Sequence, residues 1–260
     1  MTLQIARNTY EVLDDGRVRV ENPKPLKITA TSLAGIVNRS PWNTPYQIAC
    51  RLLRVCKDDI SGKPSVKAGN DLESVILQYS RNNGLPTLKT AEELFGKKVG
   101  DHDDWKSDFE HPVFGGHVDG KLEDGTIIEV KTASDPTQWV EGIPEHYWLQ
   151  ASLYARMNHV DNIIFLVGFL QPEDYQNHYK WKPEGNVYRY DVGVHPEIDS
   201  IMEYAQNWYH EYIENGITPA PETAEDYKLA DILRIENGEG TVEGMISDLA
   251  SINDRMSASL

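Results

Sequence analysis

The order of apolar and polar positions divides most of the chain into short predicted helices and strands. Apolar residues that recur every three or four positions predict helices, and runs rich in Val, Ile and Phe predict strands. The predicted helices cover residues 31–38, 44–57, 67–83, 144–158 and 197–215. The predicted strands cover residues 113–122, 126–133, 162–170 and 187–192, with a further hairpin over 10–20 and a loop or irregular strand over 89–112. We therefore expect an α/β protein with a mixed central β-sheet flanked by α-helices.

The hairpin formed by residues 113–133 carries the most informative side chains. Its turn contains Asp124-Gly125, and Asp-Gly is a strong hairpin signal. Direct pairing across this turn places Asp119 opposite Glu129, with their Cβ atoms about 4.5–5.5 Å apart. Because side chains alternate along a strand, Lys131 points to the same face as Glu129.

Two carboxylates at this separation repel each other unless a cation neutralises them. Mg²⁺ suits oxygen ligands and keeps waters and substrate phosphates in its shell. A neighbouring lysine can orient a water or stabilise charge on a phosphate. The group Asp119, Glu129 and Lys131 therefore predicts metal-assisted phosphodiester cleavage.

The alternative for this hairpin is a solvated surface that carries charged residues by chance. Ile127, Ile128 and Val130 make the second strand apolar on both faces and predict that it is buried, where charged groups need partners. Gly116 and Gly120 leave the backbone beside Asp119 open to close approach. Both features favour a functional site.

The composition of the chain and the positions of its proline residues indicate how it is organised. Its 260 residues are 40% hydrophobic and 25% charged, which is typical of a globular protein. The segment 218–222 is rich in proline and predicts a linker, so we expect one domain over 1–217 and a tail over 218–260 with an amphipathic helix near 241–256.

Three features favour the cytoplasm as the location of the protein. No apolar run approaches the about 18–20 residues of a membrane span, and the N-terminal segment lacks the apolar core of a signal peptide. The two cysteines, Cys50 and Cys56, fall in one predicted helix and are too few for a disulfide framework or a four-cysteine cluster.

Charge is distributed unevenly along the chain, whose net charge is −16. Residues 1–131 contain 18 basic and 19 acidic residues, a net of −1, whereas residues 132–260 contain 7 and 22, a net of −15. An acidic second half argues against loose, nonspecific binding to DNA, and indicates a surface that faces away from phosphate or meets a basic partner. It leaves room for a focused basic channel.

Two further motifs flank the hairpin in a specific order. Gly69-Asn-Asp-Leu-Glu73 lies on the preceding predicted helix, and Gln150-Ala-Ser-Leu-Tyr154 on the following one. With the hairpin, this ordered set resembles the PD-(D/E)xK nuclease superfamily, and within it the lambda-type exonuclease or YqaJ-like viral recombinase family. The stretches 28–32 and 40–46 are also similar to the N-terminal signature of that family. The resemblance covers residues 26–215.

The resemblance implies a restriction-endonuclease-like core and a role for each matching residue. Asp119, Glu129 and the Val130 carbonyl would bind Mg²⁺, for which Mn²⁺ can substitute, and Glu73 would be a further acidic ligand. Lys131 would be the catalytic lysine, and Gln150 would position the substrate or the attacking water. Candidates for binding the DNA substrate, including a 5′-phosphate, are Lys24, Thr31, Ser32, His117 and Tyr154. The chain departs from the family pattern at Val118, where a proline is expected.

The family resemblance also implies a reaction and partners. Its members digest one strand of duplex DNA from a 5′ end, several are ring-shaped trimers, and they act in phage-type recombination with a single-strand annealing protein. The sequence leaves two alternatives open: a structure-specific or restriction-type endonuclease of the same superfamily, and a non-catalytic module that binds DNA or a recombination protein.

Overall fold

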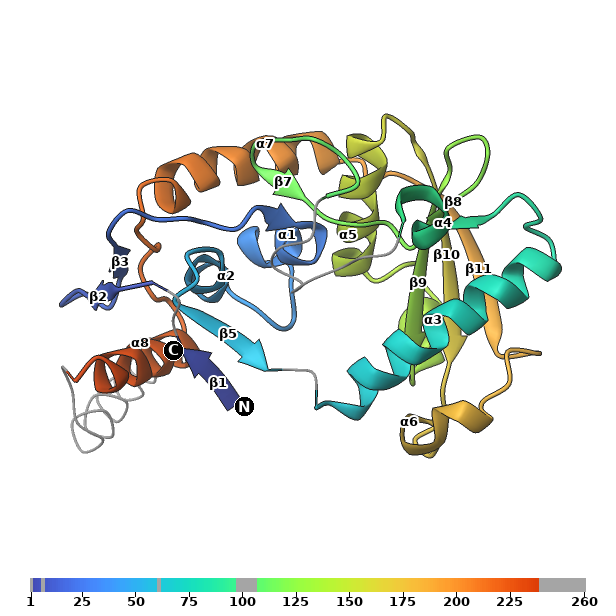
Figure 1. Ribbon diagram of the computed structural model, residues 1–260, viewed down its shortest axis with the longest axis horizontal. Helices are drawn as coiled ribbons and strands as arrows, with labels where there is room; N and C mark the ends of the chain where they lie inside the picture. The colour runs from blue at the N-terminus through green and yellow to red at the C-terminus, as the bar shows by residue number, and fades with distance from the viewer. Residues whose placement is uncertain (1, 6–7, 60–61, 97–106, 239–260) are drawn as a thin grey trace. The chain divides into compact units, whose positions relative to one another are not determined.

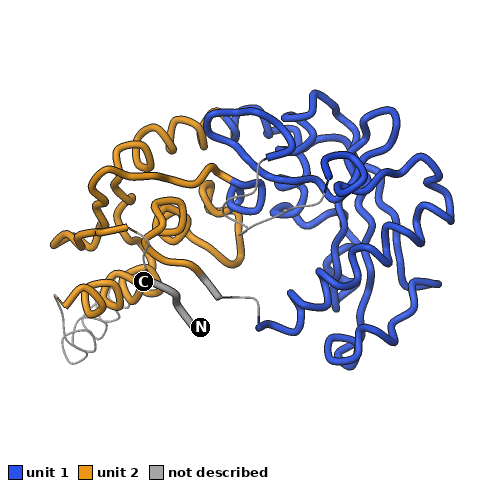
Figure 2. The backbone as a smooth tube through the Cα atoms, in the orientation of Figure 1, with its two compact units in different colours: residues 1, 29–34, 59–202 blue, residues 2–28, 35–58, 203–260 orange. Residues whose placement is uncertain are grey.

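The structure is a computed structural model that describes residues 2–5, 8–59, 62–96 and 107–238. The chain separates into two compact units (Figure 2). Unit 1 comprises chiefly residues 29–34 and 59–202, and unit 2 comprises residues 2–28, 35–58 and 203–260. The elements that pass from one unit to the other along the chain are β4 (Ile28–Thr29), α1 (Ala30–Ile36), β5 (Cys56–Asp59) and α7 (Ile198–Trp208).

A five-stranded sheet forms the centre of unit 1 (Figure 1). Its strands follow the order β11 (Val187–Gly193), β10 (Asn162–Phe169), β9 (Ile127–Ala133), β8 (Gly120–Lys121) and β6 (Lys89–Thr90). β9 and β10 are parallel, and the other neighbouring pairs are antiparallel. The sheet is therefore mixed, and the predicted α/β fold class is confirmed.

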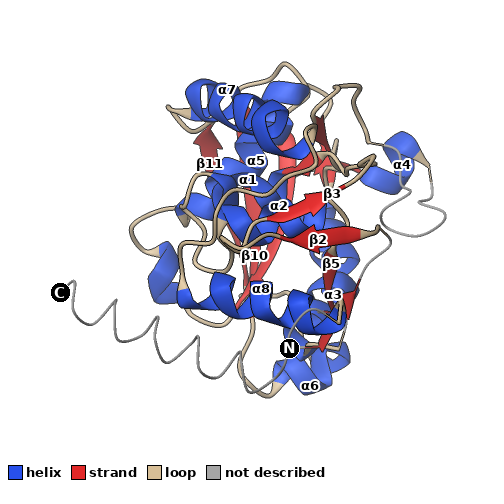
Figure 3. Cartoon of the chain, turned by 90° about the vertical axis from the view of Figure 1, so that its left-hand side faces the viewer, coloured by secondary structure: helices blue, strands red, loops and turns tan. Residues whose placement is uncertain are grey.

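The helices α3 and α5 pack on the sheet of unit 1. Figure 3 distinguishes the helices of the chain from its strands by colour. The long α3 crosses the sheet and buries an apolar stripe that includes Leu72 and Ile76. The helices within unit 1 are α3 (Pro64–Asn82), α4 (Ala91–Phe95), α5 (Glu145–Met157) and α6 (Asp174–Asn177), with the short 3₁₀ turns η2 (Pro136–Trp139) and η3 (His178–Lys180). Among the described residues, no helix is long and apolar enough to cross a membrane.

Alternation along β9 gives the two faces of the sheet different contents. Ile128 and Val130 join Ile164, Leu166 and residues of α3 in one apolar cluster. Glu129 and Lys131 point to the opposite face, which α5 covers. The sheet thus has an α3 face that is apolar and an α5 face that carries charged residues.

Unit 2 is built from short elements. They are the strand β1 (Thr2–Ile5), which pairs with β5, the hairpin of β2 (Tyr10–Val12) and β3 (Val18–Val20), the helices α2 (Pro45–Leu52) and α8 (Ala224–Glu236), and the π-helical turn η4 (Tyr209–Ile213). The buried Tyr46 of α2 donates a hydrogen bond to the Gly16 carbonyl, 2.9 Å away. The predicted 10–20 hairpin is confirmed by this pairing of β2 with β3.

Two sequence-based predictions for the first half of the chain were wrong. The helix expected over 44–57 begins as predicted, with Thr44 accepting a hydrogen bond from the Gln47 amide, but it ends at Leu52. Arg54 takes a positive φ of 57°, which stops the helix, and Cys56 begins β5 instead. The strand expected over 113–122 is split into β7 (Phe114–Gly115) and β8, with a loop between them.

Other elements were not predicted. The segment 89–112 contains β6 and α4, whose start has a capping box between Thr90 and Glu93. The segment after residue 217 contains α8. At the start of this segment, Thr218 is buried and its hydroxyl accepts a hydrogen bond from the Val18 N–H, so this residue is not part of an open linker. The helix predicted near 241–256 lies outside the described residues, and the division between 1–217 and 218–260 stays a prediction.

Candidate active site

The β8–β9 hairpin has the register predicted from the sequence. Gly120 pairs with Ile128, so the next position brings Asp119 to the level of Glu129. Asp119 Oδ2 accepts a hydrogen bond of 2.7 Å from the Val130 backbone N–H. The backbone of β9 therefore fixes the orientation of the Asp119 carboxylate beside Glu129.

Glu129, Lys131 and Gln150 form a closed group of polar contacts. Glu129 Oε1 accepts hydrogen bonds of 2.7 Å from both Lys131 Nζ and Gln150 Nε2. Lys131 Nζ also donates to Gln150 Oε1 at 3.2 Å. Because β9 supplies the first two side chains and α5 the third, packing of the helix on the sheet assembles the group.

Burial governs the electrostatics of this group. Glu129 is only 1% exposed. Burial raises its pKa, the charges of Asp119 and Glu73 act in the same direction, and Lys131 opposes them. Burial lowers the pKa of Lys131, but the surrounding carboxylates outweigh it, so the net shift is upward and the lysine is an ammonium ion at neutral pH.

The carboxylates fit a hard divalent cation. Glu129 Oε2 is buried and has no hydrogen-bond partner among the residues that the structure describes. Asp119 and the half-buried Glu73 of α3 both lie close enough to raise the pKa of Glu129 by their charge. An orphaned carboxylate oxygen in a cluster of acids is what a cation would satisfy.

The loop before Asp119 is held by Asp108. Its Oδ1 lies 2.7 Å from His117 Nδ1, its Oδ2 accepts 2.9 Å from the Val118 N–H, and its own N–H donates to the Gly116 carbonyl at 3.0 Å. The Asp108 side chain is 2% exposed. His117, one of the candidates for binding the DNA substrate, is thus engaged with a buried acid. Its contact with substrate stays a prediction.

Gly116 allows Tyr154 to pack against this loop. A Cβ atom at Gly116 would lie 2.7 Å from Tyr154 Cε1, and its φ of +150° also favours glycine. Tyr154 is 5% exposed, and burial raises the pKa of its phenol. In this position Tyr154 packs against the loop that precedes Asp119. Its predicted contact with DNA stays a prediction.

The remaining candidates for DNA binding lie outside this group. Thr31 is exposed and Ser32 shares a hydrogen bond of 3.0 Å with Thr29, both in the first turn of α1. Lys24 is exposed and belongs to unit 2. Their roles at a 5′-phosphate stay predictions.

Sequence reasoning missed two residues on α5 that face the site. The Tyr147 ring lies 5.0 Å from Lys131 Nζ, a cation–π contact. His146 Nε2 is buried and has no hydrogen-bond partner in the described ranges; burial and the charge of Lys131 lower the pKa of this imidazole. Both residues precede Gln150 by one helical turn, which is the signal that could have identified them.

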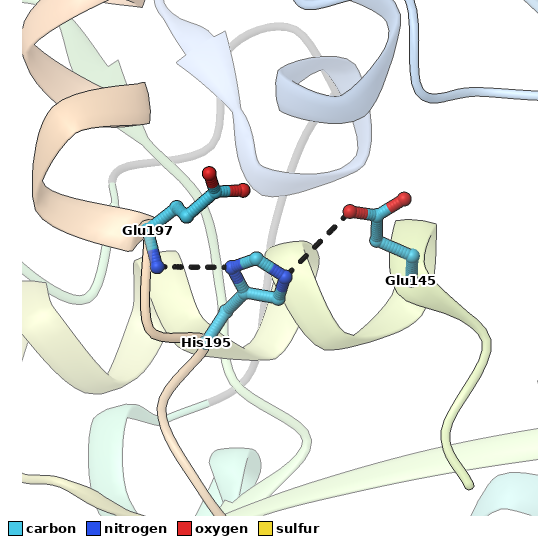
Figure 4. A group of neighbouring side chains, drawn as sticks. All are labelled: Glu145, His195 and Glu197. Carbon is cyan, nitrogen blue, oxygen red and sulfur yellow. Dashed lines mark hydrogen bonds and ion pairs between the residues drawn. The ribbon is translucent and has the colours of Figure 1, made fainter. Parts of the chain in front are cut away.

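A second group of side chains that could bind a metal ion lies near the N-terminal end of α5 (Figure 4). The ligand atoms of Glu145, His195 and Glu197 lie within 4.8 Å of one another. His195 Nδ1 accepts a hydrogen bond of 3.2 Å from the Glu197 N–H, so Nε2 carries the ring proton and points toward Glu145, 3.6 Å away. A metal would require the other tautomer; as arranged, His195 joins α5 to the start of α7.

Comparisons with known proteins are consistent with this picture. A family model described as YqaJ-like viral recombinase domain matches residues 17–158, which include every residue of the Asp119 site. The uncharacterized protein MG373 of Mycoplasma genitalium is 23% identical over 240 residues, covering 74% of this chain and 83% of that protein.

Two solved structures are also similar to this chain. An alkaline exonuclease from Laribacter hongkongensis gives a TM-score of 0.48 at 17% identity, covering 71% of this chain and 87% of that one. A phage related exonuclease from Haemophilus somnus 129PT gives a TM-score of 0.48 at 14% identity, covering 73% of this chain and 96% of that one.

Proposed function

The chain belongs to the YqaJ-like viral recombinase domain family, and from this membership and the geometry of its acidic site we propose that it is a divalent-cation-dependent deoxyribonuclease. The observation that carries the proposal is the hydrogen-bonded group of Asp119, Glu129, Lys131 and Gln150, in which Glu129 is buried and the other three are half-buried. Burying charged residues together is costly, and a binding module has no need of opposed carboxylates beside a lysine.

Each side chain has a defined task in the proposed hydrolysis. Asp119, Glu129 and the Val130 carbonyl would hold Mg²⁺, with Glu73 as a further ligand and Mn²⁺ as a possible substitute. When bound, the cation lowers the pKa of a water and neutralises phosphate charge. Lys131, held by Glu129 and Gln150, keeps its ammonium group aimed at the site and stabilises negative charge that develops on the phosphate. The Gln150 amide orients the phosphate or the attacking water.

The finer parts of the proposal follow from the family resemblance. We propose digestion of linear duplex DNA from 5′ to 3′, in the cytoplasm, to provide single strands for phage-type recombination. A homotrimeric ring and a single-strand annealing protein as partner belong to the same proposal. Lys24, Thr31, Ser32, His117 and Tyr154 are the proposed contacts to the DNA.

A cleavage assay with matched substrates tests these points. The wild-type protein and Asp119→Asn are incubated with Mg²⁺ or EDTA and with linear duplexes that carry 5′-phosphate or 5′-hydroxyl, beside a covalently closed circle. We expect Mg²⁺-dependent digestion of the linear DNA by the wild type only, faster with 5′-phosphate, and an intact circle. Cutting of the circle would favour an endonuclease, and no digestion of any substrate would contradict the proposal.

A further inference from the structure

A row of aromatic side chains continues from the candidate active site across the sheet. Val167 of β10 pairs with Lys131 on one side and with Tyr188 of β11 on the other. Phe165 pairs in the same way with Glu129 and Tyr190. Paired residues point to the same face of a sheet, so Tyr188 and Tyr190 share the α5 face with Glu129 and Lys131.

The aromatic rings contact one another along this face. Tyr147, which lies over Lys131, stacks on Trp139 with ring centroids 5.8 Å apart and an interplanar angle of 19°. Trp139 lies 5.5 Å from Tyr190 and 6.5 Å from Phe169. Phe169 in turn packs edge-on against Tyr188 at 5.2 Å. The row is thus continuous from the catalytic lysine to the edge strand.

The row changes from buried to exposed along its length. Trp139 is 3% exposed, whereas Tyr188 is 50% exposed and Val140, next to Trp139, is 79% exposed. The buried Phe169 ring packs against Tyr188, and about half of the Tyr188 surface stays exposed to solvent. An exposed aromatic on a rigid aromatic support is a suitable platform for a flat ligand.

We propose that Tyr188 is a nucleobase-stacking subsite for the DNA strand whose phosphate lies at Lys131. This inference rests on the proposed function. Strands are about 4.8 Å apart, so Tyr188 lies two strands or about 10 Å from Lys131. At about 3.4 Å per nucleotide, this distance corresponds to about three nucleotides.

Charge on this surface favours bases over phosphates as the bound group. By alternation Arg189, the basic neighbour of Tyr188, points to the α3 face, where Asp191 holds it with a hydrogen bond of 2.7 Å between Nε and Oδ2, so its charge is directed away from Tyr188. The second half of the chain is strongly acidic. Since every base has a π-face, stacking binds a strand without a basic surface. The occupant is therefore an unpaired base, about three positions from the scissile phosphate.

Removal of single bases from the substrate tests the inference. Linear duplexes carry one abasic nucleotide at positions one to six from the digested end, and KM and kcat are measured for the wild type, Tyr188→Ala and Tyr188→Phe. We expect an abasic nucleotide near position three to raise the KM of the wild type about tenfold. Tyr188→Ala should raise KM on intact DNA by a similar factor and lose sensitivity to that abasic position, while Tyr188→Phe keeps both properties.

Tyr179→Ala is the matched control, because Tyr179 is 71% exposed but lies in η3, away from the paired row. An unchanged KM for Tyr188→Ala, or an equal effect of Tyr179→Ala, would overturn the inference. So would a lower oligomeric mass of Tyr188→Ala by light scattering, which would make this face an interface between copies.

A binding readout separates this inference from the proposed function. A single-stranded oligonucleotide with 2-aminopurine near position three is titrated with wild type and Tyr188→Ala in EDTA. Fluorescence quenching that needs Tyr188 supports the subsite even if the protein cleaves nothing. Equal quenching by both proteins, beside normal cleavage, would overturn the subsite and leave the nuclease proposal standing.

Discussion

The two faces of the central sheet are made from the same strand and differ in almost every property. On the α3 face, Ile128 and Val130 of β9 pack in an apolar cluster. On the α5 face, their neighbours, the buried Glu129 and the half-buried Lys131, form a polar group with Gln150. Because side chains alternate, one residue of β9 separates a position that stabilises the fold from one that serves the site.

The comparison indicates how a small protein can tolerate buried charges. A buried ion pair gives little net stability, since desolvation offsets the attraction of the charges. The apolar α3 face supplies the burial that keeps β9 in place. The α5 face can then hold Glu129 where its pKa is raised and its second oxygen is unsatisfied.

The largest expected effect comes from the α5 face. Lys131→Met removes the ammonium group that Glu129 and Gln150 hold, and should lower kcat about 100- to 1000-fold while the fold persists. Lys121→Met, which changes the lysine of neighbouring β8, should leave most of the activity. Rates of nucleotide release and circular dichroism check both; equal losses for the two variants would argue against a specific role of Lys131.

A substitution on the α3 face should lower the stability of the protein and leave its activity nearly unchanged. Ile128→Ala removes a fully buried side chain from the apolar cluster and should lower the free energy of unfolding by about 2–5 kcal/mol. Specific activity of the folded fraction should change little. Urea unfolding and activity below the transition measure the two quantities, and a selective loss of activity would contradict the division between the faces.

A smaller effect is expected from the loop that carries Asp119. Asp108→Ala removes the acceptor for the Val118 N–H and the partner of His117, which should lower the free energy of unfolding by about 1–3 kcal/mol. Activity should fall further than stability explains, because the loop that leads into Asp119 is no longer held in place. Asp108→Asn keeps one acceptor oxygen and should recover part of kcat; identical kcat for all three proteins would rule out this positioning role.

The smallest effect concerns the edge of the α3 face, where Arg81 of α3 pairs with Glu93 of α4. The hydrogen bond from Arg81 holds the pKa of Glu93 at about 2. Since the pKa of an unfolded glutamate is about 4.3, this pair stabilises the protein fully above that pH and loses its effect as pH falls toward 2. The difference in urea midpoint between wild type and Glu93→Gln should be constant above about pH 5 and shrink below it; a difference independent of pH would contradict the assignment.

The sequence was sufficient where local rules determine the structure. The Asp124-Gly125 turn sets the register of β8 with β9, and alternation then places Asp119, Glu129 and Lys131 on one face. Apolar spacing likewise identified α3 and α5. These signals depend only on residues close together in the chain.

The sequence was insufficient where distant segments decide the structure. Cys56 is in a strand because β1, some 50 residues earlier in the chain, pairs with it. Asp108 acts on the loop before Asp119 from a segment without periodicity. The helices α4 and α8 begin at capping boxes but bury few apolar side chains, so the capping box is the signal that could have predicted them.

The most direct test compares two neighbouring positions of β9 in one assay. Initial rates of Mg²⁺-dependent nucleotide release from linear duplex DNA are measured for Glu129→Gln and Ile128→Val, each normalised to its folded fraction. The two-face account predicts that Glu129→Gln is nearly inactive and as stable as the wild type, while Ile128→Val keeps wild-type rates. Full activity of Glu129→Gln would contradict the assignment of the site.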